Sequence, residues 1–354
     1  MTFTGRGLYA ASSKEPRRRR RGAWLLVGAV LALALLVTGV IGAVSNVHVD
    51  LEPRSDTYGG VERIAIESEA SGTITVTGAA PGAPAPPDAP EPPDPPAGAE
   101  DRPEPAPRPV AVGEVTVDRS FSGSPVDRPE ENAELEEGTL ELDASCAGFF
   151  SGCAADYEIT VPAGVAVEIE ADSADVEVAG VDAPVNVETS SGTIDLAGVT
   201  GDVEVSSSSG DLSLDGIEGG VDADTETGSV TVAGNGPYIS VESTRGEIDL
   251  RGFDADSVEA ESTTGEVALD GAFRTAAVET TTGSVEITAA ERFDLLEVES
   301  TTGSVGVLVP EGGAYRVLGE SVTGDRAVDV AVDGDARSVI DATTTTGSVT
   351  VGHA

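Results

Sequence analysis

The chain has 354 residues, a formal charge of −43 at pH 7 and only 4% aromatic residues. The low aromatic content is typical of a β-solenoid, whose narrow core takes small branched side chains. Its only dense basic cluster, Arg17 to Arg21, precedes an apolar run and is better explained as a membrane-topology signal than as a nucleic-acid site, so no nucleic-acid partner is expected.

Residues 1–22 are therefore predicted to be a basic cytoplasmic tail. Residues 23–44 carry no charge and are long enough to cross a bilayer of about 30 Å. The arginines before this run predict a single-pass protein of the cell membrane, with a cytoplasmic N-terminus and an extracellular C-terminal domain. A cleaved signal peptide is the alternative. Its apolar core is normally shorter, about 7–15 residues, and Ala43-Val44-Ser45 is a weak cleavage site, so an uncleaved anchor is favoured.

Three short regions follow the predicted anchor. Residues 45–60 are predicted to be a stalk. Residues 61–78 contain Ser71-Gly72-Thr73-Ile74-Thr75-Val76, a copy of a phrase that recurs later, and are predicted to form the first solenoid coil. Residues 79–110 hold 13 of the 21 prolines, which predicts a disordered, acidic, polyproline-like insertion or spacer without a core.

Residues 111–354 are predicted to form the main β-solenoid domain. Cys146 and Cys153 are the only cysteines. Outside the membrane, such a close pair is expected to form a disulfide rather than a free redox pair. A metal site would need further thiols or histidines nearby, and His48 and His353 are distant in sequence.

The stretch from Val185 to Val351 repeats one phrase, Ser/Thr-x-x-Gly followed by alternating apolar residues, at spacings of 18 to 23 residues. Apolar and polar residues alternate on both sides of each glycine, which predicts two short strands that bend at a glycine corner. The phrase glycines are Gly192, Gly210, Gly228, Gly246, Gly265, Gly283, Gly303, Gly324 and Gly347.

About 18 residues are enough for one solenoid coil, and stacking such coils at about 4.8 Å would pair equivalent strands in parallel. The fold predicted is thus all-β, a parallel β-solenoid or β-helix of ~18-residue coils, plus one N-terminal transmembrane helix. An antiparallel sandwich is the alternative, but the period is too regular for hairpins of differing length.

Two inward aliphatic columns are expected, one from Ile194 to Val305 and one from Leu196 to Val307, with Arg326 interrupting the first. A third inward column, three residues before each glycine, consists of Ser or Thr, whose hydroxyls are expected to bond to their neighbours or to the corner backbone.

The Cys146 and Cys153 pair, the strand ending Val161-Pro162-Ala163-Gly164 and the Ser/Thr-Gly repeats together resemble the bacterial putative-adhesin family, over roughly residues 61–351. The resemblance implies a cell-envelope β-solenoid domain of unknown function, linked in some members to envelope-stress responses. It implies no catalytic residues.

Many parallel β-helices act on polysaccharides, so a carbohydrate-active enzyme is one alternative. Such chemistry needs a base beside metal-binding or acidic groups. The region beyond the membrane has no lysine, and Arg245, Arg251, Arg274, Arg292 and Arg316 share no register. No enzyme activity and no cofactor are therefore expected.

The most ordered polar feature is an outward position four residues before each glycine. Stacking is expected to place its carboxylates in a column about 5 Å apart. The column is either a solvated face that keeps the rod soluble, or a weak surface for Ca²⁺, Mg²⁺ or cationic peptides. Its members are Glu170, Glu188, Asp224, Glu242, Glu261, Glu279, Glu299 and Glu320, interrupted by Ser206 and Thr343.

The function expected is that of a non-catalytic, membrane-anchored extracytoplasmic protein in surface interaction, adhesion or envelope-stress sensing, with envelope components or cationic peptides as partners. A purely structural surface spacer is the second hypothesis.

Overall fold

The computed structural model describes residues 49–79, 113–123, 129–146 and 153–354. The predicted anchor at 23–44 and nearly all of the predicted insertion at 79–110 lie outside these ranges. Within them, the structure contains no helix long and apolar enough to cross a bilayer.

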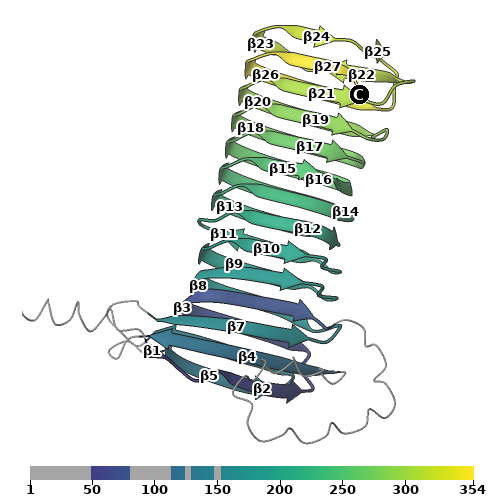
Figure 1. The fold of residues 1–354 in the computed structure, drawn as a ribbon. Coiled ribbons are helices and arrows are strands. Elements are labelled where there is room, and N and C mark those ends of the chain that lie inside the picture. The colour runs from purple at the N-terminus through teal and green to yellow at the C-terminus, as the bar shows by residue number, and fades with distance from the viewer. Residues whose placement is uncertain (1–48, 80–112, 124–128, 147–152) are drawn as a thin grey trace, which may run out of the picture.

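Every regular element of the described residues is a β-strand, and the strands stack into one long rod (Figure 1). The strands are β1 (Val49–Asp50), β2 (Arg54–Gly59), β3 (Arg63–Gly78), β4 (Glu114–Gly123), β5 (Pro129–Glu136), β6 (Thr139–Cys146), β7 (Ala154–Val161), β8 (Ala166–Ala179), β9 (Val185–Ser191), β10 (Ile194–Ala197), β11 (Val203–Ser207), β12 (Leu212–Glu218), β13 (Val221–Thr227), β14 (Val230–Arg245), β15 (Ile248–Arg251), β16 (Phe253–Thr264), β17 (Val267–Gly271), β18 (Phe273–Thr282), β19 (Val285–Ala289), β20 (Leu295–Thr302), β21 (Val305–Val309), β22 (Ala314–Leu318), β23 (Ser321–Thr323), β24 (Arg326–Val328), β25 (Ala331–Val332), β26 (Val339–Thr346) and β27 (Val349–His353).

Equivalent strands of successive coils pair in parallel and in register, as predicted. Ile194 of β10 lies opposite Leu212 of β12, which lies opposite Val230 of β14. The strands before the glycines form a second parallel ladder, in which Thr189 of β9 lies opposite Ser207 of β11. The parallel register of the repeats excludes the antiparallel sandwich.

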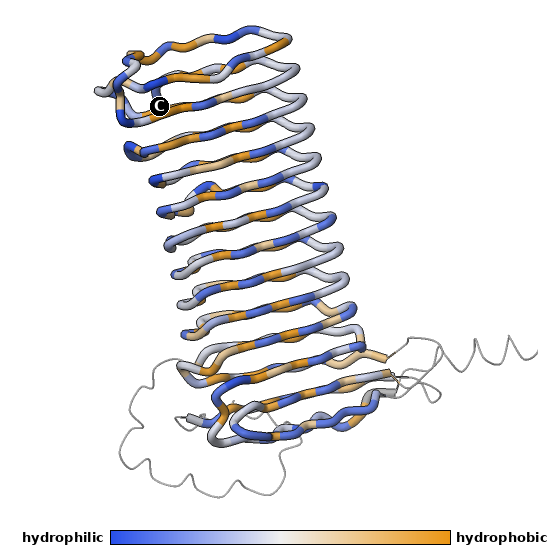
Figure 2. Tube along the Cα trace, turned by 180° about the vertical axis from the view of Figure 1, so that it is seen from behind, coloured by the Kyte–Doolittle hydropathy of each residue, from blue (hydrophilic) through white to orange (hydrophobic). Residues whose placement is uncertain are grey.

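The two inward columns are buried along the whole stack. Val230, Ile248, Val267 and Val285 are completely shielded from solvent. The hydropathy of the chain alternates residue by residue along each coil (Figure 2). The core is thus a narrow aliphatic cylinder, and each fully buried side chain contributes roughly 1.5–3 kcal/mol.

At the base of the rod, the coils are not stacked in the order in which they follow one another in the chain. The coil of residues 61–78, predicted as the first, lies between two later segments: β3 pairs with β8 on one side and with β6 and β7 on the other. Beneath that layer the pairing becomes antiparallel, between β4 and β7 and between β5 and β6. The base of the rod is therefore an antiparallel cap, which the parallel repeat pattern did not predict.

The prediction that residues 45–60 form a stalk is wrong for its described part. Residues 54–59 form β2, which pairs antiparallel with β4, and Val49 and Asp50 pair with the far end of the same strand. Nearly all β2 side chains are exposed because it is the edge strand, so its sequence lacks the alternation of a buried strand.

The distal end shows the same change of order. The last coil of the chain, residues 339–353, is inserted between β20–β21 and the earlier segment β22–β24. The column from Ile194 to Val305 therefore continues with Val349, and Arg326 lies opposite Val349 on the terminal layer. Arg326 is tolerated because this layer is open to solvent on its distal side.

Each corner is crowded by the corner of the adjoining coil. A Cβ added to Gly246 would overlap the carbonyl oxygen of Gly228, and Gly246 has a φ of +149°. The same overlap recurs at Gly210, Gly228, Gly265, Gly283 and Gly303. In the coil beneath β3, a disulfide between Cys146 and Cys153 stands near the corner instead, with Cα atoms 6.1 Å apart.

The alternation predicts sharply different costs for neighbouring substitutions. Val267→Asp places an unpaired charge in the aliphatic column and should cost several kcal/mol of unfolding free energy. Glu266→Lys, one residue earlier and exposed, should change it by less than about 0.5 kcal/mol. Thermal denaturation of both variants checks this, and equal melting temperatures would contradict the inward and outward assignment.

Candidate functional site

The position four residues before each glycine forms the predicted column on the outer face of the rod. Register places Asp224 opposite Glu242, Glu242 opposite Glu261, and Glu261 opposite Glu279. Glu279 lies opposite Glu299, and towards the base Glu170 lies opposite Glu188. We call the run Asp224, Glu242, Glu261, Glu279 and Glu299 the carboxylate column, because it is unbroken over five coils.

The structure separates the other predicted members from this run. Ser206 divides Glu188 from Asp224. Thr343 lies opposite Glu299, and Glu320 belongs to the terminal layer beyond Thr343, so Glu320 does not join the column.

Sequence reasoning missed two acids at the basal end of the same ladder. Glu67 lies opposite Glu170 on one side and opposite Asp143 on the other. The register shifts between Ser68 and Ser71, so counting four residues back from Gly72 reaches Ser68 instead of Glu67. Asp143 precedes no phrase glycine, so only the pairing of β6 with β3 reveals it.

Burial and, after it, the charges of neighbouring acids raise the pKa of two carboxyl groups in the carboxylate column. Partial burial of the carboxyl group, followed by the charges of Asp222 and Glu242, raises the pKa of Asp224. Burial, followed by the charges of Glu242 and Glu279, raises the pKa of Glu261. Both carboxylates are therefore destabilised in their ionised form, and a positive partner would relieve that cost.

A shallow groove of about 540 Å³ runs beside the carboxylate column. The carboxylates line one side, and the outward residues two positions further along line the other. Those residues are Glu226, Thr244, Thr263, Thr281 and Thr301. The groove thus offers carboxylates and hydroxyls at the regular interval of the strands and can accept a linear, cationic, hydrogen-bonding ligand.

The inward Ser and Thr residues at the corners are buried, as predicted, except for the half-buried Ser321 of the terminal layer. Thr344 donates to the carbonyl oxygen of Gly303 at 2.9 Å, and Ser300 donates to that of Gly283 at 3.4 Å. These bonds confirm the predicted contact with the corner backbone at Ser300 and Thr344, but the prediction fails for five other members of the column. The hydroxyls of Ser207, Thr225, Ser243, Ser262 and Thr280 have no such partner.

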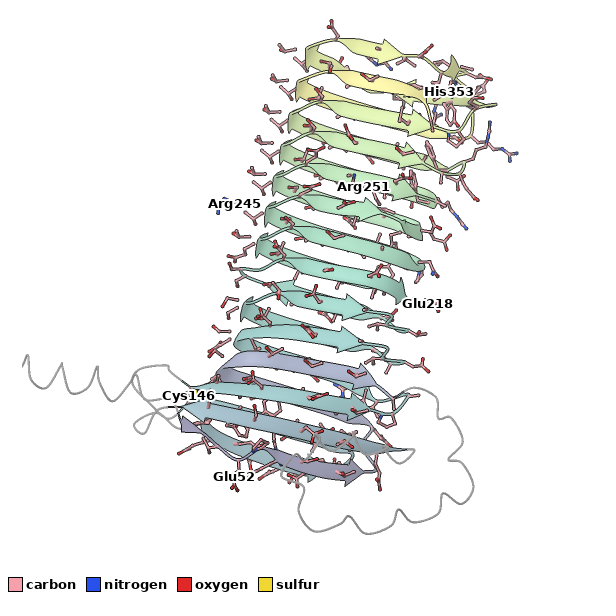
Figure 3. The ribbon with its side chains drawn as sticks, in the orientation of Figure 1. Glu52, Cys146, Glu218, Arg245, Arg251 and His353 are labelled. Carbon is pink, nitrogen blue, oxygen red and sulfur yellow. A yellow bond between two sulfur atoms is a disulfide. The ribbon has the colours of Figure 1, made fainter. Side chains whose placement is uncertain are left out.

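The metal ligands and the arginines considered in the sequence analysis do not gather at one place in the structure. Among the described residues, no group of three or more His, Cys, Asp or Glu side chains has metal-binding geometry. Arg245 projects at the glycine corner, whereas Arg251 lies on another face (Figure 3). Arg251 contacts Asp249, and Arg274 lies 3.2 Å from Asp256.

Comparison with known proteins finds one family. The family described as Toastrack DUF4097 matches residues 58–236 and 220–352. This match confirms the resemblance found in the sequence over residues 61–351. No curated protein matches the chain.

Two solved structures are similar. A putative adhesin from Bacteroides fragilis NCTC 9343 is 13% identical with a TM-score of 0.35, and the match covers 73% of this chain and 97% of that one. A putative cell adhesion protein from Clostridium sporogenes ATCC 15579 is 11% identical with a TM-score of 0.19, and the match covers 86% of this chain and 100% of that one.

The raised pKa values predict how stability varies with pH. A folded state that holds protons more tightly than the unfolded chain gains stability as pH falls. Asp224 and Glu261 should therefore favour unfolding at pH 7 and cease to do so in mild acid. Glu261→Gln should therefore raise stability at pH 7, by roughly 0.2–1 kcal/mol, the range for charges facing across strands. The gain should shrink towards pH 4.

Glu286→Gln is the matched control. Glu286 is exposed on the other ladder and lies between Ala268 and Gly306, so it has no acidic neighbour in register. Melting temperatures measured from pH 7 to about pH 4 compare the stability gain of Glu261→Gln with that of Glu286→Gln. Equal gains for the two variants would show that crowding in the column has no effect.

Proposed function

Because the chain belongs to the Toastrack DUF4097 family, we propose that it is a non-catalytic envelope protein whose rod presents the carboxylate column to cationic partners. The observation that carries this proposal is the unbroken register of five acids beside an open groove. Binding there is multivalent and electrostatic, because each coil adds one weak contact. Lysine- or arginine-rich peptides and hydrated divalent ions are the partners whose chemistry fits.

The proposal includes the predicted topology, with residues 23–44 as an uncleaved membrane anchor. Val49, the first residue of β1, follows the end of that segment by five positions. Since four intervening residues span at most about 14 Å, the antiparallel cap is the membrane-facing end of the rod. The terminal layer β22–β25 is then the end furthest from the membrane.

A purely structural spacer is the competing function. A spacer needs the stack and the charge for solubility, but it needs no unbroken column on one face. Binding that depends on the position of the acids, and not on their number, therefore separates the two functions.

The test of binding uses Glu242→Gln, Glu261→Gln, Glu279→Gln and Glu299→Gln combined in one variant. It should bind a lysine-rich decapeptide at least about tenfold more weakly than the wild type, since four surface charge contacts of about 0.3–0.5 kcal/mol are lost. Isothermal titration calorimetry measures the affinity. Millimolar Ca²⁺ should also raise the melting temperature of the wild type more than NaCl of equal ionic strength, and the variant should lose that excess.

A second quadruple variant supplies the control. It carries Asp195→Asn, Asp215→Asn, Asp270→Asn and Glu286→Gln, four exposed acids on the other ladder, and so it has the same net charge. It should retain the affinity and the Ca²⁺ effect. Equal losses in both variants would leave only a solvated acidic face and support the spacer.

The topology is tested separately on intact cells. External protease should remove the chain beyond Leu51 and leave residues 1–22 protected, because the arginines hold the tail in the cytoplasm. Immunoblots against tags at the two ends follow each part. A protected C-terminus would overturn the orientation, and release of the rod into the medium would indicate cleavage.

A further inference from the structure

The core of the rod ends at the base on a buried charge. Arg119 of β4 occupies an inward position, opposite Tyr157 of β7 and Arg54 of β2, and only 6% of its surface is exposed. Its guanidinium contacts the carboxylates of Asp56 on β2 and Glu131 on β5. These are the two outermost strands, so one arginine holds both edges of the cap.

Other titratable groups surround this ion cluster. Arg54 of β2 lies 3.9 Å from Glu131. Among the residues that the structure describes, the buried hydroxyl of Tyr157 of β7, directly opposite Arg119, has no hydrogen-bond partner, and neither has the Nε of Arg119. Tyr58 of β2 and Asp143 of β6 complete the polar surroundings. The guanidinium therefore depends on Asp56 and Glu131 for compensation, since a buried charge that loses its partner is strongly unfavourable.

Of the two edge strands, β2 is the more weakly held. It has six residues paired with β4, and its only half-buried side chain is that of Tyr58. In contrast, β5 pairs with β6 over eight residues. Gly59 ends β2 and Gly60 follows it, both with nothing near their Cβ positions, and Gly60 has a φ of +76°, so the strand can pivot there.

We propose that residues 49–59 are a strap, held against the base by the Arg119 ion cluster and released in acid. Protonation of Asp56 and Glu131 leaves the guanidinium charged, because arginine does not titrate in this range. Departure of the strap admits water to Arg119 and removes the cost of its burial. Under the proposed topology the strap joins the anchor to the rod, so its release lengthens that link by up to about 35–40 Å.

Hydrogen–deuterium exchange of the full chain in detergent micelles tests this proposal. After correction for the intrinsic rate, exchange in residues 49–60 should accelerate by up to about fivefold between pH 7 and about pH 4, the limit that two paired carboxylates set by linkage, while residues 185–214 stay protected. Asp56→Asn should cause the same acceleration at pH 7. Asp118→Asn should not, because Asp118 is exposed on the outer side of the same strand pair, opposite Ser55.

The variant Arg119→Met distinguishes release of the strap through the ion cluster from release through a general effect of acid on the fold. Without the buried charge the strap should stay protected at about pH 4, with Arg54 still available to Glu131. The proposal is overturned if Asp56→Asn leaves exchange unchanged, if Asp118→Asn accelerates it equally, or if the strap of Arg119→Met is released in acid. Loss of protection in residues 185–214 alongside the strap would equally overturn it.

Discussion

The fold depends on the contact between corner glycines of adjoining coils. The backbone of one corner rests on the carbonyl oxygen of the corner beneath it, in the space where any other residue would carry its Cβ. Register along the rod is fixed at this contact, since a slip of one residue would put a side chain into that space and turn every inward residue outward. The buried Ser and Thr before the glycine reinforce it where they donate to the same carbonyls.

The carboxylate column follows from this register. Parallel in-register pairing places like residues opposite one another, so an acid repeated once per coil must face its own copies. Aliphatic residues benefit from that arrangement, whereas the charges of neighbouring acids, after burial, raise the pKa values of Asp224 and Glu261. One geometric rule therefore builds both the apolar core and the charged face.

The sequence was sufficient to predict the inward and outward residues, because alternation and the glycine period are local properties. It could not predict which coils are neighbours. Every phrase glycine fits against any other, so nothing in residues 339–353 shows that they pair with both the preceding coil and the terminal layer. Glu67 was missed because a shift of register moves it by one position. The strand at 54–59 was missed because it is exposed on the base and has no alternation. The ion cluster of Arg119 was missed because Asp56 lies 63 residues before Arg119 in the sequence.

The placement of the first and last coils has a consequence for folding during synthesis. Residues 63–78 are synthesised early but acquire neighbours on both sides only when residues 139–179 have followed. At the other end, residues 314–328 emerge first, yet the position next to β20 and β21 belongs to residues 339–353. A chain that is synthesised from its N-terminus cannot simply add coils in order, and the final coil must enter between two segments that have already been made. Neither residues 63–78 nor residues 339–353 form an outermost layer of the rod. Unfolding either coil must therefore break its strand pairing on both sides at once.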